Sequence, residues 1–283
     1  MISNIQPIQI PAKDGFLLSS NLYLAELEKG KVVIINSATG VSKTLYHHYA
    51  LFLQQQGYSV ITYDYRGIAA SRPEKLRGFK ASFNDWGQLD FHGVVDYVTE
   101  TFPHHKIIVL GHSIGGTLVG ISENIQRLSG VLTIGAQPAF YKDWKPFTQQ
   151  IKLYFLWHLL FPFLNEVVGY MPGKSLKLIE DIPYQAMKDW NQRRKSPNIS
   201  QQFKAAGCDL FFDSYKEKLL TIGIADDPIG TTDGIRRIHD LFQSAEKEWL
   251  ILNDEREIGH FGFFSRKFEK TLWIKTLEWV ETI

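Results

Sequence analysis

Short apolar runs alternate along the chain with longer stretches in which apolar residues recur at helical spacing. Two short runs with strand character flank a turn near the N-terminus, at residues 8–10 and 17–24. Further apolar runs occupy residues 31–36, 58–63, 106–110, 130–134, 219–224 and 248–252. Stretches with helical spacing follow most of these runs, at residues 45–56, 85–101, 115–127, 232–242 and 268–283. This alternation predicts an α/β fold with a mostly parallel, twisted sheet flanked by helices.

The alternation is interrupted between residues 138 and 207. That stretch is aromatic and helical in character, holds three of the seven tryptophans, and has no convincing buried strand. A chain of 283 residues suits one core with an inserted subdomain better than two independent domains. We therefore predict a core formed by residues 1–137 and 208–283, with residues 138–207 inserted as a helical cap.

The most apolar stretch, residues 151–164, would form a helix of about 21 Å, against roughly 30 Å of bilayer hydrocarbon. It also contains Lys152, His158 and Pro162, so we expect no transmembrane segment. Residues 1–14 lack the basic and apolar regions of a signal peptide. The single cysteine, Cys208, cannot form an intrachain disulfide and is expected to be buried, which permits a reducing compartment. These features predict a cytoplasmic protein.

Charge gives little sign of a macromolecular partner. The chain has 31 basic and 30 acidic residues, without a long run of either sign, so we expect no nucleic-acid binding. The densest basic cluster, Arg193-Arg194-Lys195, is interpreted as the solvated face of a helix. H-E-x-x-H, C-x-x-C and Walker patterns do not occur in the sequence, and we expect no metal or cofactor. The sequence is compatible with a homodimer but does not determine oligomeric state.

One motif points to nucleophilic catalysis. The stretch Gly111-His112-Ser113-Ile114-Gly115 matches G-x-S-x-G, and it lies between an apolar run and a stretch with helical spacing. In a strand–turn–helix context this motif holds a serine in a strained turn, and glycines two residues away remove a steric collision. The N-terminus of the following helix then faces the developing negative charge. The sequence therefore predicts Ser113 as a nucleophile, with His112 packed elsewhere rather than acting as its base.

A serine nucleophile needs a general base. With this motif the acid and then the histidine follow the serine along the chain. Only His158, His239 and His260 follow Ser113, and His260 lies on a glycine-flanked loop after the run 248–252. A histidine on such a loop can reach a site at the end of the sheet. We therefore predict that His260 is the base.

Two adjacent aspartates compete for the role of the residue that orients the base. Both Asp226 and Asp227 follow the apolar run 219–224, while Asp254 is a weaker candidate. In the loop pattern typical of the fold that carries this serine motif, the acid lies three residues after a glycine that ends the strand, and counting from Gly223 favours Asp226 over Asp227. The other aspartate is then expected to cap the loop.

Together these residues resemble the α/β-hydrolase superfamily. The resemblance covers nearly the whole core and rests on Asp14-Gly15, Asp64-Tyr-Arg-Gly67 with Ser71, Gly111–Gly116, Asp226 and Gly259-His260. Within the superfamily the chain is similar to bacterial predicted hydrolases distantly related to monoacylglycerol lipases and serine aminopeptidases. That similarity rests on Ala38-Thr-Gly-Val41, Gly169-Tyr-Met-Pro172 and Gly259-His-Phe-Gly-Phe-Phe264.

The resemblance also suggests the donors of an oxyanion hole. One should be the backbone N–H of Ile114, the residue after the nucleophile. The stretch Ser37-Ala38-Thr39-Gly40 falls where related hydrolases carry His-Gly-x-Gly, which nominates the backbone N–H of Thr39, with Ala38 as the alternative. This chain departs from the family pattern here, because it has Ser37-Ala38 in place of His-Gly next to the second donor.

The combined prediction is a serine hydrolase that cleaves a carboxylic ester or thioester through an acyl-enzyme intermediate. An apolar cap favours a small substrate with an apolar acyl or aromatic group. Two alternatives stay open. The same triad could hydrolyse an amide, peptide or carbon–carbon bond, or the chain could be a catalytically silent binding protein.

Overall fold

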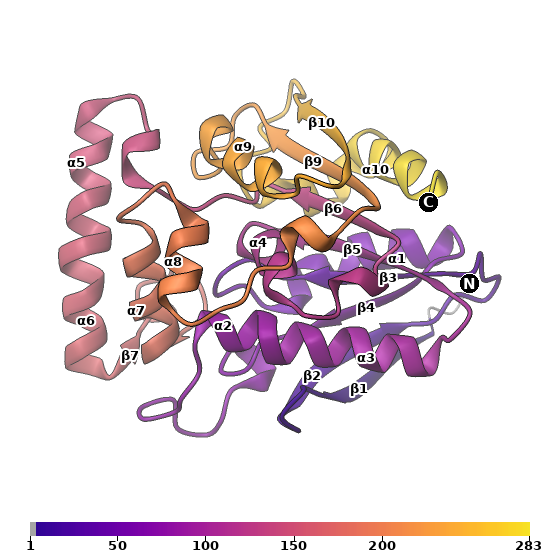
Figure 1. Ribbon diagram of the computed structural model, residues 1–283, viewed down its shortest axis with the longest axis horizontal. Coiled ribbons are helices and arrows are strands. Elements are labelled where there is room, and N and C mark those ends of the chain that lie inside the picture. Colours follow the sequence, from indigo (N-terminus) through magenta and orange to yellow (C-terminus); the bar gives the residue numbers. More distant parts are fainter. Residues whose placement is uncertain (1–3) are drawn as a thin grey trace.

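A computed structural model describes residues 4–283 of the chain, so the first three residues of the predicted core lie outside the described residues. Its centre is an eight-stranded sheet in the order β1-β2-β4-β3-β5-β6-β9-β10 (Figure 1). The pairings of β2 with β1 and with β4 are antiparallel, and the other neighbours are parallel. The strands are β1 (Ile5–Pro11), β2 (Leu17–Tyr23), β3 (Lys31–Asn36), β4 (Ser59–Tyr63), β5 (Lys106–His112), β6 (Gly130–Ile134), β9 (Lys218–Ile224) and β10 (Glu246–Leu252). This confirms the predicted mostly parallel sheet.

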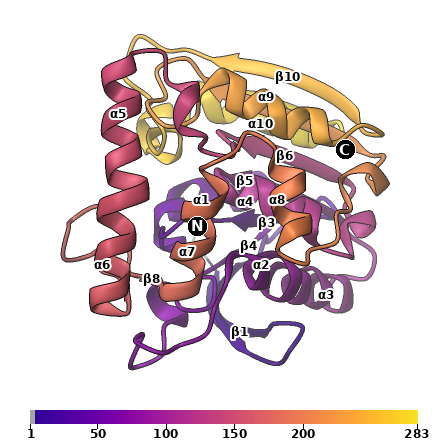
Figure 2. The same ribbon diagram turned by 60° about the vertical axis from the view of Figure 1, so that its left-hand side comes forward.

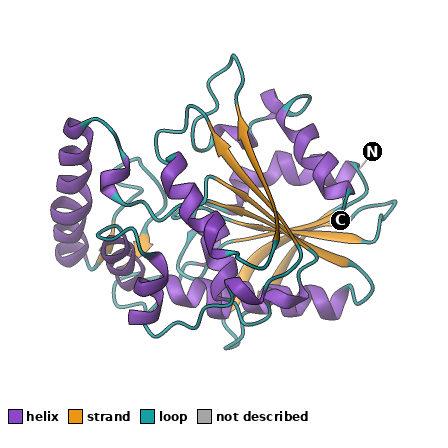
Figure 3. Ribbon diagram, turned by 45° about the horizontal axis from the view of Figure 1, so that its top comes forward, coloured by secondary structure: helices purple, strands orange, loops and turns teal. Residues whose placement is uncertain are grey.

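Helices cover both faces of the twisted sheet (Figure 3). In β3, Val32 and Ile34 pack into the core on one side, while Val33 and Ile35 pack into the core on the other. Both sets of side chains are buried, which explains why this strand is a continuous apolar run instead of an alternating pattern. The flanking helices are α1 (His47–Gln55) and α10 (Leu272–Glu281) on one face, with α3 (His92–Thr101), α4 (Ile114–Leu118) and α9 (Thr232–Leu241) on the other.

Two predicted helices differ in detail from the structure. The helix expected at residues 85–101 begins two residues earlier, as α2 (Phe83–Asp85), and passes through a π-helical turn, Trp86–Phe91, before α3. The helix expected at residues 115–127 is wrong in length, because α4 ends in a 3-10 turn at Ile121. Ser122 has extended backbone and its hydroxyl donates to Asn124, so local side-chain bonding replaces the helix there.

The inserted segment lies between β6 and β9 and stands to one side of the sheet (Figures 1 and 2). It contains α5 (Phe147–Phe155), a π-helical turn (Leu156–Leu160), α6 (Phe161–Val168), α7 (Tyr184–Arg193) and α8 (Ile199–Ala205). One correction concerns strands: β7 (Tyr170–Met171) and β8 (Ile182–Pro183) pair antiparallel, which the sequence pattern did not indicate. In Figure 1, α7 and α8 lie between the long helix α5–α6 and the sheet.

The helix formed by α5 and α6 is longer than the sequence suggested. It runs without a break over Phe147–Val168, 22 residues, and by length and composition alone it could cross a membrane. At 1.5 Å per residue it spans about 33 Å, so the length argument against a membrane helix is wrong. One side of this helix packs on the rest of the cap. There Trp157 of the helix contacts Trp144, with ring centroids 5.2 Å apart.

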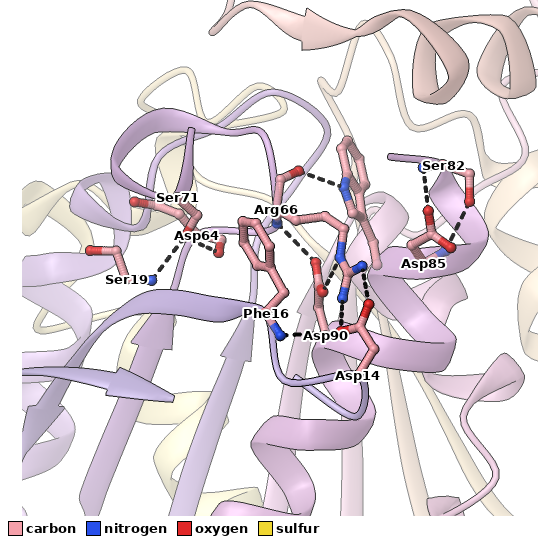
Figure 4. A network of polar contacts seen from close by, with 10 residues as sticks. Asp14, Phe16, Ser19, Asp64, Arg66, Ser71, Ser82, Asp85 and Asp90 are labelled. Carbon is pink, nitrogen blue, oxygen red and sulfur yellow. Dashed lines mark hydrogen bonds and ion pairs between the residues drawn. The ribbon is translucent and has the colours of Figure 1, made fainter. Parts of the chain in front are cut away.

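A buried ion pair joins the N-terminal hairpin to the sheet and to the helix that follows (Figure 4). Arg66, in the loop after β4, donates to both carboxylate oxygens of Asp14 at 2.8 Å. Its Nε donates to Asp90 at 2.6 Å, and its backbone N–H donates to the same carboxylate at 2.8 Å. Asp90 is fully buried, whereas the Asp14 side chain is 42% exposed. The Asp14-Gly15 turn and the Asp64–Gly67 stretch thus meet in one polar cluster.

We predict that Asp90→Asn lowers the free energy of unfolding by about 3 kcal/mol, because it leaves the Arg66 guanidinium buried with too little counter-charge. Asp14→Asn, at the half-exposed partner, should cost about 1 kcal/mol or less. Urea unfolding of both variants at pH 7 measures the difference. Equal losses for the two variants would contradict this assignment.

Candidate active site

Ser113 occupies a strained turn between β5 and α4. Its φ of 53° and ψ of −121° are unusual for a residue with a side chain. A Cβ at Gly111 would lie 2.4 Å from the Cα of Gly116, and one at Gly115 would lie 2.4 Å from the carbonyl oxygen of Asn36. The two glycines therefore allow the close backbone approach that the motif predicted. The Ser113 backbone N–H donates to the Ile134 carbonyl at 2.9 Å, which fixes the turn against β6.

The imidazole of His260 is held by Asp227. The distance from its Nδ1 to the Asp227 carboxylate is 2.7 Å, and both side chains are almost completely buried. The other carboxylate oxygen accepts the backbone N–H groups of Ile229 and Gly230, each at 2.7 Å. These bonds orient the carboxylate, which in turn orients the ring.

The preference for Asp226 as the partner of His260 is wrong, and the alternative, Asp227, occupies that place. Gly223 does not end the strand, because β9 continues to Ile224 and the turn begins at Ala225. Asp226 is exposed and accepts the backbone N–H groups of Ile258 at 2.8 Å and Gly259 at 3.0 Å. It therefore caps the loop that carries His260, which is the role expected for the other aspartate.

The protonation of this pair follows from its bonds. Burial by itself raises the pKa of Asp227, but the hydrogen bond and charge of His260 and the amides of Gly230 and Ile229 lower that pKa below its ordinary value. An ionised carboxylate only accepts, so the Nδ1 of His260 carries the hydrogen. The Nε2 of a neutral His260 then has a lone pair, and His260 and Ser113 line the same cavity. Within the described residues no hydrogen bond joins their side chains, which is common before substrate binds.

His112 belongs to a buried chain of hydrogen bonds beside the site. One of its ring nitrogens, Nε2, lies 2.9 Å from the carbonyl oxygen of His260, so that nitrogen must donate. The other, Nδ1, then accepts from the hydroxyl of Tyr46 at 2.9 Å, and the oxygen of Tyr46 accepts the backbone N–H of Ala38 at 2.8 Å. This agrees with the expectation that His112 is packed and hydrogen-bonded. The chain links the loop of His260 to the loop after β3.

The same chain separates the two candidates for a second oxyanion donor. The N–H of Ala38 is already bonded to Tyr46, whereas that of Thr39 has no acceptor within residues 4–283. The N–H of Ile114, at the start of α4, likewise has no acceptor in the described chain. Thr39 and Ile114 both line the cavity beside Ser113.

These residues meet at one edge of the sheet because β3, β5, β9 and β10 are parallel. Thr39, Ser113, Asp227 and His260 each follow the carboxyl end of one of these strands. The cavity there has a volume of about 340 Å³, near the small end of the range for small-molecule sites. The cap supplies most of its apolar wall, which includes Leu153, Trp157, Phe161, Met171, Trp190 and Ile199.

The interpretation of Arg193-Arg194-Lys195 as a solvated helix face is wrong for its first two residues. Arg193 and Arg194 are 4% and 2% exposed and line the cavity, while Lys195 is exposed. Arg194 lies over the ring of Trp190 at 3.4 Å and that of Trp157 at 4.0 Å. The burial of these two arginines was missed because it depends on the side of helix α7 that faces the cavity, which the charges of neighbouring residues do not reveal. The only feature of the sequence that could have indicated it is the presence of Trp157 and Trp190, on which Arg194 stacks.

The sequence analysis also missed Tyr46 and the glycines that make room for Asp227. A Cβ at Gly230 would lie 2.5 Å from the Asp227 carboxylate, and one at Gly135 would lie 3.2 Å from it. Gly230 directly follows the acid loop and could have been noticed. Tyr46 reaches the site through the hydrogen bonds of its hydroxyl to His112 and Ala38, and nothing in its sequence neighbours indicates this.

The sheet order, the strained serine turn and the cap between β6 and β9 define an α/β hydrolase. Solved structures with this fold cover nearly the whole chain. The esterase Pf2001 of Pyrococcus furiosus has a TM-score of 0.63 at 16% identity, covering 99% of this chain and 93% of its own. DcsB in complex with its substrate analogue has a TM-score of 0.68 at 16% identity, covering 99% of both chains. A thermostable carboxyl esterase from Bacillus coagulans has a TM-score of 0.64 at 12% identity, covering 100% of this chain and 99% of its own.

The sequence itself gives the family. The family described as serine aminopeptidase, S33, matches residues 28–178, just over half of the chain, and the chain belongs to that family. No curated protein matches the sequence. The resemblance drawn from the motifs is therefore confirmed.

The buried His112 predicts a pH dependence of stability. Burial first, and then the charge of His260, lower the pKa of His112 to about 3, against an ordinary value of 6.5. Below pH 6.5 the unfolded chain gains a proton at this residue that the folded chain does not, so stability falls as the pH falls toward 3. At the steepest part of this range, the titration of His112 lowers the free energy of unfolding by about 1.4 kcal/mol for each pH unit.

The matched variant His112→Gln keeps a donor and an acceptor but cannot titrate. Urea unfolding of both proteins between pH 7 and pH 4.5 should show a steeper loss for the native chain. Parallel pH profiles would show that His112 is not held neutral by the fold.

Proposed function

We propose that this protein is a serine hydrolase that cleaves a carboxylic ester or thioester through an acyl-enzyme intermediate. The observation that carries the proposal is the meeting of three groups in one cavity: the strained Ser113, His260 held by the buried Asp227, and two backbone N–H groups that have no acceptor within residues 4–283. A Ser–His–Asp arrangement beside such donors is the geometry of acyl transfer.

The reaction follows from these positions. The Ser113 hydroxyl attacks the substrate carbonyl while the Nε2 of His260 takes its proton. The negative oxygen that forms is stabilised by the backbone N–H groups of Ile114 and Thr39. Asp227 holds the imidazole in the correct tautomer and stabilises its cation. His260 then protonates the leaving alcohol or thiol, and water repeats the sequence to release the acid.

An ester or thioester suits the site better than a charged peptide. Apolar cap residues form most of the cavity wall, and apolar walls favour an acyl chain or aromatic ring. Several proteins with the same fold, at 12–16% sequence identity to this chain, are esterases. Their activity guides the choice of test substrates. No step in this sequence requires a cofactor. The cytoplasmic location stays a prediction.

A fluorophosphonate probe tests the nucleophile directly. We expect covalent labelling of the folded native protein and none of Ser113→Ala, with Ser265→Ala, at an exposed site on the loop after His260, labelled normally. The same proteins are then assayed with p-nitrophenyl esters of increasing acyl length and with aminoacyl amides. Absence of labelling would favour a silent binding protein, and cleavage of amides only would replace the ester assignment.

The two aspartates provide a matched pair of variants. Asp227→Asn should lower kcat by on the order of 10³–10⁴, because the amide no longer holds the correct imidazole tautomer. Asp226→Asn keeps an acceptor on the loop and should lower kcat less than about tenfold. Steady-state ester hydrolysis, with circular dichroism to verify folding, compares them. A larger loss for Asp226→Asn would reverse the assignment.

A further inference from the structure

The cap places a guanidinium without a counter-ion in the wall of the cavity that contains Ser113 and His260. Arg194 is 2% exposed, and its Nε and Nη1 have no hydrogen-bond partner within residues 4–283. In the same described range no carboxylate forms an ion pair with it. Its planar group is stacked between Trp190 and Trp157 instead.

Such an arrangement is costly unless something else compensates for it. Arginine keeps its proton in proteins, so burial does not simply neutralise the side chain. Burying a charge without a partner costs several kcal/mol, and a desolvated indole ring recovers about 2 kcal/mol per contact without supplying a hydrogen-bond acceptor in the ring plane. Burial also lowers the pKa of Arg194, and a bound anion would oppose that shift. Within the described chain the side chain makes no hydrogen bond to another element, and its contact with the long cap helix is the stack on Trp157. Its polar N–H groups are therefore available to a ligand.

The neighbouring arginine behaves differently. Arg193 donates to the side chain of Asn84 and lies over the ring of Phe203 at 3.9 Å, and the charge of Asp189 opposes the lowering of its pKa by burial. It therefore ties the cap to the core. Of the two buried cations, Arg194 is the one left without a polar partner in residues 4–283.

We propose that Arg194 binds a carboxylate carried by the substrate, so that the preferred substrate is an ester or thioester with an apolar chain and a free carboxylate. This inference rests on the proposed function, since it assigns a specificity-determining residue to that site. The guanidinium and a carboxylate are matched in shape and charge. The apolar residues that line the same cavity as Arg194, Ser113 and His260 then hold the chain that connects the carboxylate to the scissile bond.

The cavity favours a carboxylate over a phosphate. A phosphate carries more charge and more acceptor oxygens and needs several donors. Apart from the two arginines, the cap residues of the wall are apolar. Arg193 already donates to Asn84 through Nη2, while its buried Nη1 lacks a partner within residues 4–283. One guanidinium without any polar partner in an apolar wall suits a singly charged group at the end of an apolar chain.

Paired substrates test the proposal. The p-nitrophenyl monoesters of adipic and suberic acid carry a free carboxylate, and p-nitrophenyl hexanoate and octanoate are their neutral counterparts. Acyl esters of 4-hydroxybenzoate place the carboxylate in the leaving group instead. We expect the native protein to prefer carboxylate substrates in at least one of these arms. Arg194→Met should lower kcat/KM for the preferred anionic substrate about 10- to 100-fold, the factor that a charge-assisted hydrogen bond supplies.

Control variants separate this role from a general effect of charge. With Arg194→Met, kcat/KM for the neutral esters should change less than about threefold. Arg194→Lys keeps the positive charge and should retain part of the preference. Lys195→Met removes an adjacent but exposed charge and should leave both substrate classes unchanged. A native protein without any carboxylate preference, or a preference unaffected in Arg194→Met, would overturn the proposal.

A binding measurement without catalysis distinguishes failure of this inference from failure of the proposed function. In Ser113→Ala, monomethyl adipate should raise Tm more than methyl hexanoate, and the second substitution Arg194→Met should abolish that difference. Arg194→Met alone should have an unchanged or higher Tm, because it removes an unpaired buried charge. Carboxylate binding without ester hydrolysis would support Arg194 while refuting the proposed reaction. Hydrolysis of neutral esters without carboxylate binding would do the reverse.

Discussion

The backbone of Ser113 has a φ of 53°, a conformation that costs a residue with a side chain on the order of 1–3 kcal/mol. The surrounding structure holds it there, because β5 is hydrogen-bonded on both sides in the sheet and α4 starts at the next residue. Gly111 and Gly115 remove the two side chains that would collide with neighbouring backbone. The turn therefore places a hydroxyl above the carboxyl edge of the sheet together with the N–H groups of a new helix. The other parts of the site are arranged around this fixed point.

The loops around Ser113 are aligned by buried polar contacts. Asp227 holds the ring of His260, while Asp226 holds the backbone of the same loop, so two adjacent carboxylates share the positioning of one histidine. On the other side of the ring, His112 and Tyr46 connect the carbonyl of His260 to the N–H of Ala38. Because each of these groups has one role as donor or acceptor, the network admits one tautomer of His112. It also leaves the N–H of Thr39 available to a substrate oxygen.

The cap supplies most of the apolar wall of the site. Beneath its apolar side chains Ser113 and His260 are only 8% and 5% exposed, and electrostatic interactions are stronger at such buried positions than in water. At such a buried position a guanidinium without a counter-ion attracts an anion strongly, and it destabilises the fold when no anion is bound. Arg194 lies at the end of α7, within the insertion, so the residue proposed to set specificity and the proposed triad come from different segments of the chain. This division would allow the cap to change without disturbing the triad.

Local pattern in the sequence determined the parallel sheet, most of its flanking helices and the turn at Ser113, because each depends on residues close together in the chain. The order of residues along the chain nominated His260 as the base, and the structure places it with Ser113 in one cavity. Three features depended on tertiary structure. The length of β9 decided between Asp226 and Asp227, since one additional strand residue changes which carboxylate reaches the ring. The packing of α7 over the cavity buried Arg194, although its neighbours in sequence are polar and charged. The hydrogen bond from Ala38 to Tyr46 left Thr39 free. Burial and partner choice are properties of neighbours in space, which a run of residues along the chain does not specify.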